Sequence, residues 1–203
     1  MVAAYDSASK RTQLVRAAKE LIHEQGFHKT TLANVADRAQ VPLGNINYYF
    51  STKRSLAEAV IASHGEALRE AFARWEAASA DPQWRLRRLV RSPLESIEAI
   101  VRFGCPHGSL CQELEKLSAE SPLVTAGTRL MRIYVDWAQQ QFRLIGYGEQ
   151  ESRETAEQLV AAIQGTMLLA HSLRSQEVLK RQLLRVESWL EEEITDRKES
   201  SRS

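Results

Sequence analysis

Apolar residues recur at helical spacing along nearly the whole of this chain. From Thr12 onward, leucines, alanines and isoleucines follow an i, i+3, i+4, i+7 pattern, which stops at Gly26, a residue suited to the left-handed position after a helix. No segment shows the period-2 alternation of a credible strand. The pattern therefore predicts an all-α fold, so any functional site has to be built on helices.

Proline, glycine and polar residues divide the pattern into separate helices. The helices expected in the first third of the chain cover residues 12–25, 31–40, 45–50 and 53–72. Those expected in the remainder cover residues 83–90, 93–102, 108–119, 122–145, 152–173 and 175–197. The polar stretch 198–203 has the composition of a disordered tail.

Length, cysteine content and hydropathy place the chain among proteins of a reducing compartment. Its 203 residues suffice for one or two compact domains, and its two cysteines, Cys105 and Cys111, do not make a disulfide framework. The N-terminus lacks the apolar run of a signal peptide, and no window approaches the ~18 apolar residues that would span a bilayer. We therefore expect a cytoplasmic protein with no membrane partner.

The distribution of charge is uneven, although the total is nearly balanced. Residues 1–64 contain eight Lys or Arg and five Asp or Glu, whereas the remainder contains 19 basic and 21 acidic residues. The basic excess therefore lies in the N-terminal third. Such an asymmetry is a weak indication that this part faces a polyanion.

Residues 31–50 have the spacing of a helix-turn-helix, with two short helices about four residues apart and a glycine after the turn. The second helix of such a pair inserts its N-terminal half into the major groove of DNA. Here it carries amides and phenols that can bond base edges and phosphate oxygens. These belong to Asn45, Asn47, Tyr48 and Tyr49. Ile46 and Phe50, at i and i+4, are the expected inward anchor; the alternative is that the Tyr-Tyr-Phe run is only an aromatic patch in a core.

The span from residue 12 to residue 61 resembles the DNA-binding domain of the TetR family of transcriptional repressors. Several landmarks stand at matching spacing over these fifty residues. They are Glu24-Gln25-Gly26-Phe27, Thr30-Thr31, Val35-Ala36, the turn from Val41 to Gly44, Tyr48-Tyr49-Phe50, and Lys53 followed by Leu56. The resemblance implies a DNA-binding regulator that is not an enzyme and needs no cofactor.

DNA contacts are expected along the helix-turn-helix and at the two helix starts that flank it. Threonine hydroxyls before the first short helix and a lysine at the start of the next long helix are natural phosphate contacts. The full expected set is Thr30, Thr31, Leu43, Gly44, Asn45, Asn47, Tyr48, Tyr49 and Lys53. Asn47 departs from the family, which most often has an aromatic residue there, so an amide at this position can shift base preference towards adenine.

The resemblance also implies a division into a DNA-binding domain (8–52), a helical effector-binding and dimerisation domain (53–197) and the tail (198–203). A repressor with one reading helix per subunit needs a twofold dimer to contact two successive major grooves. Apolar stripes on the last two helices are the candidate interface, although such stripes are also typical of a chain's own core. They consist of Leu159, Ile163, Thr166, Leu169, Leu179, Leu183, Val186 and Leu190.

Bulky apolar residues with scattered polar ones suggest where a small, largely apolar or aromatic effector would bind. The candidate lining is Phe103, Cys105, Met131, Tyr134, Trp137, Met167 and His171. Each of these residues by itself is more typical of plain core. The family plan implies that the effector favours a conformation with wrongly spaced reading helices and so releases palindromic operator DNA.

The segment FGCPHGSLC, residues 103–111, concentrates reactive residue types in nine positions. Its C-x5-C spacing and lack of a second ligand pair are poor for structural zinc, so no metal site is expected. Pro106 suits the first turn of a helix, which would leave Cys105 at the helix N-terminus and Cys111 buried inside. A thiol at a helix N-terminus can be the more reactive one, so Cys105 carries the alternative hypothesis of a redox or electrophile sensor. An enzyme is the remaining alternative, but no Cys-His-Asp or Cys-His-Asn set is identifiable.

Overall fold

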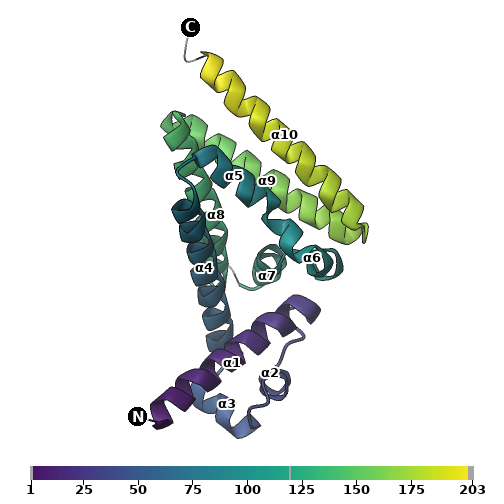
Figure 1. Ribbon diagram of the computed structural model, residues 1–203. Coiled ribbons are helices and arrows are strands. Elements are labelled where there is room, and N and C mark those ends of the chain that lie inside the picture. The colour runs from purple at the N-terminus through teal and green to yellow at the C-terminus, as the bar shows by residue number, and fades with distance from the viewer. Residues whose placement is uncertain (1, 119, 201–203) are drawn as a thin grey trace. The chain divides into compact units, whose positions relative to one another are not determined.

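The computed structural model describes residues 2–118 and 120–200, and for 2–9 and 198–200 it describes the backbone alone. The described residues are mostly helical and contain no strand, so the all-α prediction is confirmed (Figure 1). The first half contains α1 (Val2–Gln25), α2 (Leu32–Arg38), α3 (Leu43–Tyr49), α4 (Lys53–Ala78), α5 (Pro82–Arg91) and the 3-10 helix η1 (Ser92–Ser96). The second half contains α6 (Ile97–Phe103), α7 (Pro106–Leu114), α8 (Pro122–Ile145), α9 (Glu149–Ser172) and α10 (Gln176–Ser200).

The chain packs into two compact units. The first unit is Met1–Ala67 together with Pro106–Met131, and the second unit is Leu68–Cys105 together with Arg132–Ser203. The chain passes from the second unit to the first between Cys105 and Pro106, where α7 begins. These units are defined by packing alone, and the functional division expected at residues 52 and 53 stays a prediction.

The first unit is held by apolar residues from the short helices and from α1 and α4. Val35 and Ala36 of α2 are 0% and 2% exposed, and α2 packs against both α1 and α3 (Figure 1). Arg38 adds a bidentate contact to the Glu24 carboxylate of α1, at 3.2 and 2.8 Å. The two short helices are thus positioned by their buried faces, because helices of seven residues are too short to be stable alone.

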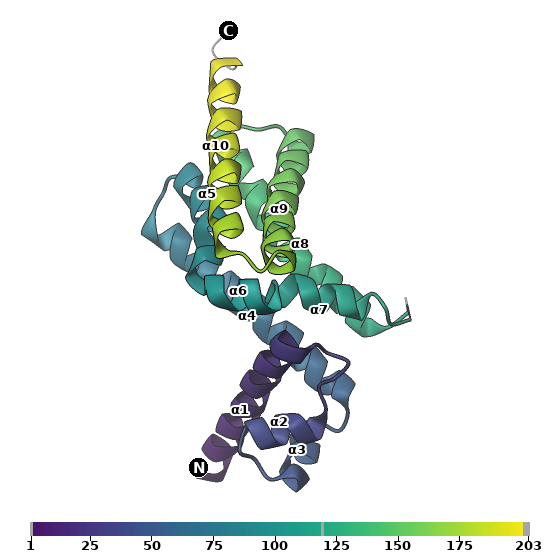
Figure 2. The same ribbon diagram turned by 90° about the vertical axis from the view of Figure 1, so that its right-hand side faces the viewer.

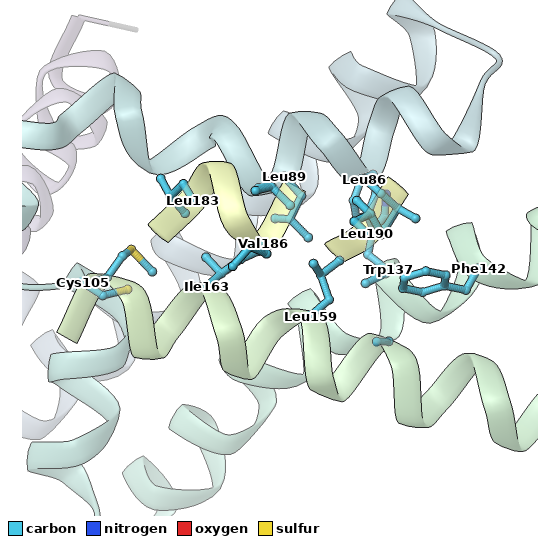
Figure 3. Packing of buried hydrophobic residues seen from close by; sticks show 14 of the residues in the cluster. Leu86, Leu89, Cys105, Trp137, Phe142, Leu159, Ile163, Leu183, Val186 and Leu190 are labelled. Carbon is cyan, nitrogen blue, oxygen red and sulfur yellow. The ribbon is translucent and has the colours of Figure 1, made fainter. Parts of the chain in front are cut away.

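The second unit is built around α9 and α10, which run side by side (Figure 2). Leucines of α5 and α10 meet residues of α9 in one apolar cluster, with the stacked Phe72 and Trp137 rings at 4.2 Å between centroids (Figure 3). Polar side chains in this unit form hydrogen bonds with partners on other helices. The Trp137 indole N–H donates to Glu76 at 2.8 Å, and the Arg91 Nε–H donates to the buried Glu187 carboxylate at 2.9 Å.

Several helix boundaries differ from the sequence-based expectation: α1 begins at Val2 where a start at residue 12 was expected, and α4 continues to Ala78 where an end at residue 72 was expected. α7 begins at Pro106 and ends at Leu114, because turns with hydrogen bonds from Leu117 and Ser121 replace the helix; residue 119 lies outside the described residues. α10 continues to Ser200 where a disordered tail was expected from residue 198, since the Glu, Arg and Lys residues there are good helix formers. The rest of that tail, 201–203, lies outside the described residues.

Candidate nucleic-acid interface

α3 is fixed in the first unit by the two anchors that the spacing predicts. Ile46 is 0% exposed and Phe50 is 2% exposed, which confirms both predictions. The turn before α3 is closed by hydrogen bonds from Gln40 N–H to the Asp37 carbonyl and from Val41 N–H to the Ala36 carbonyl, both 2.9 Å. Pro42 then precedes the helix, where its fixed φ suits a helix start.

The opposite face of α3 is open and uncharged. Tyr48 is 81% exposed and Leu43 is 55% exposed, and both asparagines of the helix are exposed beside them. Nothing lies within 4 Å of a Cβ placed on Gly44, so a ligand backbone can approach closely there. This face offers amide and phenol groups that can form hydrogen bonds. Among the contacts that the structure describes, the side chains of Asn45, Asn47 and Tyr48 form no hydrogen bond within the chain that would compete.

The two threonines before α2 have different roles, since Thr31 caps the helix and Thr30 is bonded inside the fold. Thr31 caps α2, since its hydroxyl accepts from the Asn34 N–H at 3.1 Å and Asn34 Oδ1 accepts from the Thr31 N–H at 3.2 Å. Thr30 is 2% exposed, and its hydroxyl donates to the Gly26 carbonyl at 2.8 Å. Its side chain is therefore used inside the fold, which corrects the expectation that this hydroxyl contacts phosphate.

The turn between α1 and α2 is held from two other helices of the same unit. The Lys53 ammonium of α4 donates to the His28 carbonyl at 3.0 Å and lies 4.4 Å from the centre of the Phe27 ring. The Glu113 carboxylate of α7 accepts the His28 backbone N–H at 3.1 Å. Burial lowers the pKa of Lys53, while the charge of Glu113 opposes that shift. Lys53 therefore orders the turn that leads into α2, in addition to any contact with phosphate.

The first unit thus presents a short helix with a buried anchor and an open polar face, preceded by a capped helix of the same length. Residues 14–60 match the profile of the bacterial regulatory proteins of the tetR family. This segment is therefore similar to the DNA-binding domain of that family. This match covers the helix-turn-helix and the helices on either side of it.

Curated relatives resemble this chain over less than half of its length. The HTH-type transcriptional regulator BetI of Burkholderia thailandensis is 38% identical over 90 residues, which are 44% of this chain and 46% of that protein. BetI of Burkholderia ambifaria is 37% identical over 93 residues, with the same coverage. The matched segment spans about half the length of these relatives, so their whole activity does not transfer by similarity alone.

Solved structures share the fold over nearly the whole chain at low identity. A TetR transcriptional regulator from Legionella pneumophila matches with a TM-score of 0.75 and 16% identity, covering 87% of this chain and 94% of that one. The reduced form of Escherichia coli NemR matches with a TM-score of 0.74 and 22% identity, covering 87% and 95%. At these identities the likeness establishes the architecture and says nothing of ligands.

The residues predicted for the effector pocket are spread over both units. Cys105, Trp137 and Met167 lie in the apolar cluster of the second unit, and Tyr134 packs against it. The ring of His171 lies 3.2 Å from the Val101 carbonyl, as a core histidine would. Phe103 belongs to the second unit beside Arg102, whose guanidinium is 4.8 Å from the ring centre, and Met131 belongs to the first unit.

A hollow of about 420 Å³ opens on the surface of the second unit between α4 and α8. Of the residues predicted for the pocket, only Trp137 is among its lining. The full lining is Arg69, Phe72, Ala73, Glu76, Ile133, Asp136, Trp137 and Gln140. The lining combines the aromatic rings of Phe72 and Trp137 with charged side chains.

The predicted dimer stripe is corrected by the structure. Leu159, Leu179 and Leu190 are 0% exposed, and Ile163, Thr166, Leu183 and Val186 are also buried within their own chain. A side chain covered by its own chain cannot cover a partner, so the alternative interpretation as core is right for these seven residues. Leu169 differs, since it is 43% exposed.

The outward face of α9 and α10 instead carries other apolar residues. Leu168, Leu173 and Leu184 are 53%, 58% and 62% exposed. These leucines lie outside the most regular apolar stripe, which is why periodicity does not identify them. A usable signal was present, since residues 158–173 contain no Asp, Glu, Lys or Arg although part of this helix is exposed.

The two cysteines are placed opposite to the expectation. Pro106 begins α7 as predicted, but Cys105 is 7% exposed and lies in the apolar cluster, whereas Cys111 is half-buried and its thiol contacts the Gly127 carbonyl at 3.4 Å. Cys105 is therefore not the more accessible thiol. Within the described residues, no group of three or more His, Cys, Asp or Glu side chains is arranged to hold a metal. Among the described helices, none combines the length and apolar character that a bilayer crossing would require.

Proposed function

We propose that this protein is a DNA-binding transcriptional regulator that acts as a homodimeric repressor at a palindromic operator. The observation that carries the proposal is the face of α3, where an uncharged set of amides and a phenol is exposed while Ile46 and Phe50 hold the helix from behind. Side chains of this kind read base edges in the major groove. The proposed contact set is Thr31, Leu43, Gly44, Asn45, Asn47, Tyr48, Tyr49 and Lys53, without Thr30.

The test of DNA binding is selection of bound sequences from random duplexes at low salt, followed by titration of the selected site. Asn47→Ala should weaken binding by about 1–3 kcal/mol and relax preference at one base position. Lys53→Ala should weaken all sequences alike and reduce the salt slope by about one. Arg132→Ala, which removes an equal charge from an exposed position on α8, is the matched control. Absence of any selected site at low salt would refute the proposal.

The dimer uses the outward face of α9 and α10. An exposed helix face that lacks charge over residues 158–173 and carries Leu168, Leu169 and Leu173 is costly to leave in water. Leu184 of α10 is a further exposed apolar side chain, at 62% exposure. A homodimer also supplies the second reading helix that a palindrome requires.

The test of the dimer is a pair of substitutions with the same chemistry at two exposed leucines. Leu168→Glu should yield monomers in sedimentation and lose cooperative occupation of the palindrome, because it places a charge in the apolar face. Leu144→Glu, at an equally exposed leucine at the end of α8, should remain dimeric. Dimers that survive Leu168→Glu combined with Leu184→Glu would rule out this interface.

A small, largely apolar or aromatic effector releases the operator by favouring a conformation in which the reading helices fit successive grooves poorly. Support comes from the apolar surroundings of Trp137, Met167 and Cys105 in the second unit. Since linkage is reciprocal, operator DNA should weaken effector binding by the same factor. A compound that shifts operator affinity in wild type but not in Trp137→Ala would support this, and one with equal effect on both would not.

The thiol-sensing alternative has weaker support because Cys105 is buried. Replacing both cysteines by serine should leave induction by the effector intact. Loss of induction in that variant, with its fold retained by circular dichroism, would favour thiol chemistry instead.

A further inference from the structure

Two histidine side chains face each other inside the first unit and have no part in the proposed contacts with DNA. His64 of α4 and His107 of α7 bring Nδ1 and Nε2 within 3.0 Å of each other. Their rings meet edge to face, with centroids 4.5 Å apart and an interplanar angle of 83°. His64 is 7% exposed and His107 is half-buried. The pair therefore joins α4 to α7 across 43 residues of sequence.

The groups around this pair are basic. Burial, together with the charges of His107, Lys19 and His23, lowers the pKa of His64 to about 2. Burial likewise lowers the pKa of His107 to about 4, together with the charges of Lys19 and His23. Among the described residues, no carboxylate contributes to either shift. The environment thus favours two neutral imidazoles, one donating its N–H and the other accepting.

Protons disrupt this arrangement in two steps. The first proton leaves one hydrogen bond between the rings but places a buried positive charge beside Lys19 and His23. The second proton removes the acceptor, so two cations then face each other at hydrogen-bond distance. A metal ion is not the expected occupant, because no third His, Cys, Asp or Glu among the described residues completes a ligand set.

α7 also holds the turn that leads into the helix-turn-helix. Its Glu113 carboxylate accepts the His28 N–H at 3.1 Å, and that turn continues into Thr31, the cap of α2. Loss of the contact between His64 and His107 would therefore loosen a helix that orders the start of α2.

We propose that the His64–His107 contact is a proton-sensitive latch, which holds α7 against α4 at neutral pH and releases it in acid, thereby weakening DNA binding. This inference rests on the proposed function for its effect on the operator, but the release of α7 stands independently. An imidazole released into water regains its ordinary affinity for protons. Each histidine should therefore shift the opening of α7 by about tenfold between pH 7.5 and pH 5.5.

The test compares the wild-type protein with the double variant His64→Asn, His107→Gln. These amides place hydrogen-bonding atoms near the positions of Nδ1 and Nε2 and do not titrate in this range. Hydrogen exchange of residues 106–114, corrected for the intrinsic effect of pH, measures the opening of α7. Between pH 7.5 and 5.5, wild-type protection should fall at least about tenfold more than protection in the variant. Over the same pH range, operator affinity should also fall more in the wild type than in the double variant.

The exposed His28 provides the matched control, since His28→Asn replaces an imidazole outside the pair and should retain the wild-type pH response of α7. Equal changes of protection in wild type and double variant would overturn the latch, as would an operator affinity that falls equally in both. If the double variant is poorly folded at pH 7.5, His107→Gln alone provides the comparison and should lose about half of the logarithmic response. A protein that binds no DNA at pH 7.5 would refute the proposed function, while the exchange measurement would still decide on the latch.

Discussion

The two compact units differ in how they accommodate polar groups away from water. In the second unit, the Glu187 carboxylate meets the Arg91 guanidinium and the Trp137 N–H meets the Glu76 carboxylate. In the first unit, His64 meets His107, and the nearby charges that shift them are also basic. One unit satisfies its polar groups with complementary partners, whereas the other depends on two groups remaining neutral.

Similar helical packing can therefore give different responses to solution conditions. Complementary pairs keep their partners as long as both charges persist, but a pair of neutral imidazoles exists only while protons are scarce. Acid should therefore act on the first unit before the second.

Truncation of a core leucine or isoleucine should have the largest effect on the free energy of unfolding, and the cost should be similar in the two units. Leu159→Ala in the second unit and Ile46→Ala in the first should each cost about 2–5 kcal/mol of unfolding free energy, since both side chains are 0% exposed. Urea denaturation followed by circular dichroism measures both. A cost below about 1 kcal/mol for either would show that its unit is loosely packed.

Acidification should lower the stability of the first unit more than that of the second. Because the folded pKa of each histidine lies below its ordinary value, its contribution to stability is full above about pH 6.5 and declines as pH falls from there towards the folded pKa. Between pH 7.5 and 5.5 the first unit should lose about 1.4 kcal/mol for each of the two histidines.

All four tryptophans lie in the second unit, so indole fluorescence reports on that unit while circular dichroism reports on both. The two urea transitions should diverge at pH 5.5 in wild type and remain together in the His64→Asn, His107→Gln variant. Coincident transitions in both proteins would contradict the difference between the units.

Replacing one glycine by alanine in each unit should change stability in opposite directions. Gly26 has φ +88, and a Cβ there would lie 2.6 Å from Glu113 Oε1, so Gly26→Ala should destabilise by about 1–3 kcal/mol. Gly165 of α9 has nothing within 4 Å of its Cβ position, so Gly165→Ala should stabilise the helix by up to about 1 kcal/mol. Thermal melting of the two variants in the same buffer measures the opposite signs, and equal signs would contradict the backbone argument.

The smallest effects should come from the exposed arginines. Arg38 pairs with Glu24 and Glu20 at the surface, so Arg38→Ala should change the melting temperature too little to resolve. Arg91→Ala should lower it measurably, because its partner Glu187 is 9% exposed at the side chain and loses its counter-charge. A larger effect at Arg38 than at Arg91 would reverse the proposed role of matched pairs in the second unit.

Much of the local structure was predictable from the sequence. The cap at Thr31 and the helix start at Pro106 depend on contacts within a few residues, and the i, i+4 spacing of Ile46 and Phe50 identifies the face of α3 that is buried. Hydrogen bonds of a helix and its caps link residues three or four apart, so spacing in the sequence carries this information directly. The outward polar set of α3 follows from the same periodicity.

Only the tertiary structure decided which faces of these helices are covered. Thr30 turned inward, Cys105 joined the core, and the stripe through Leu159 and Leu183 packed within its own chain. The contact between His64 and His107 joins helices that no local rule connects. The physical reason is that an apolar stripe is equally favourable against its own core or a partner, so periodicity identifies the stripe and only the packing of distant segments determines what covers it.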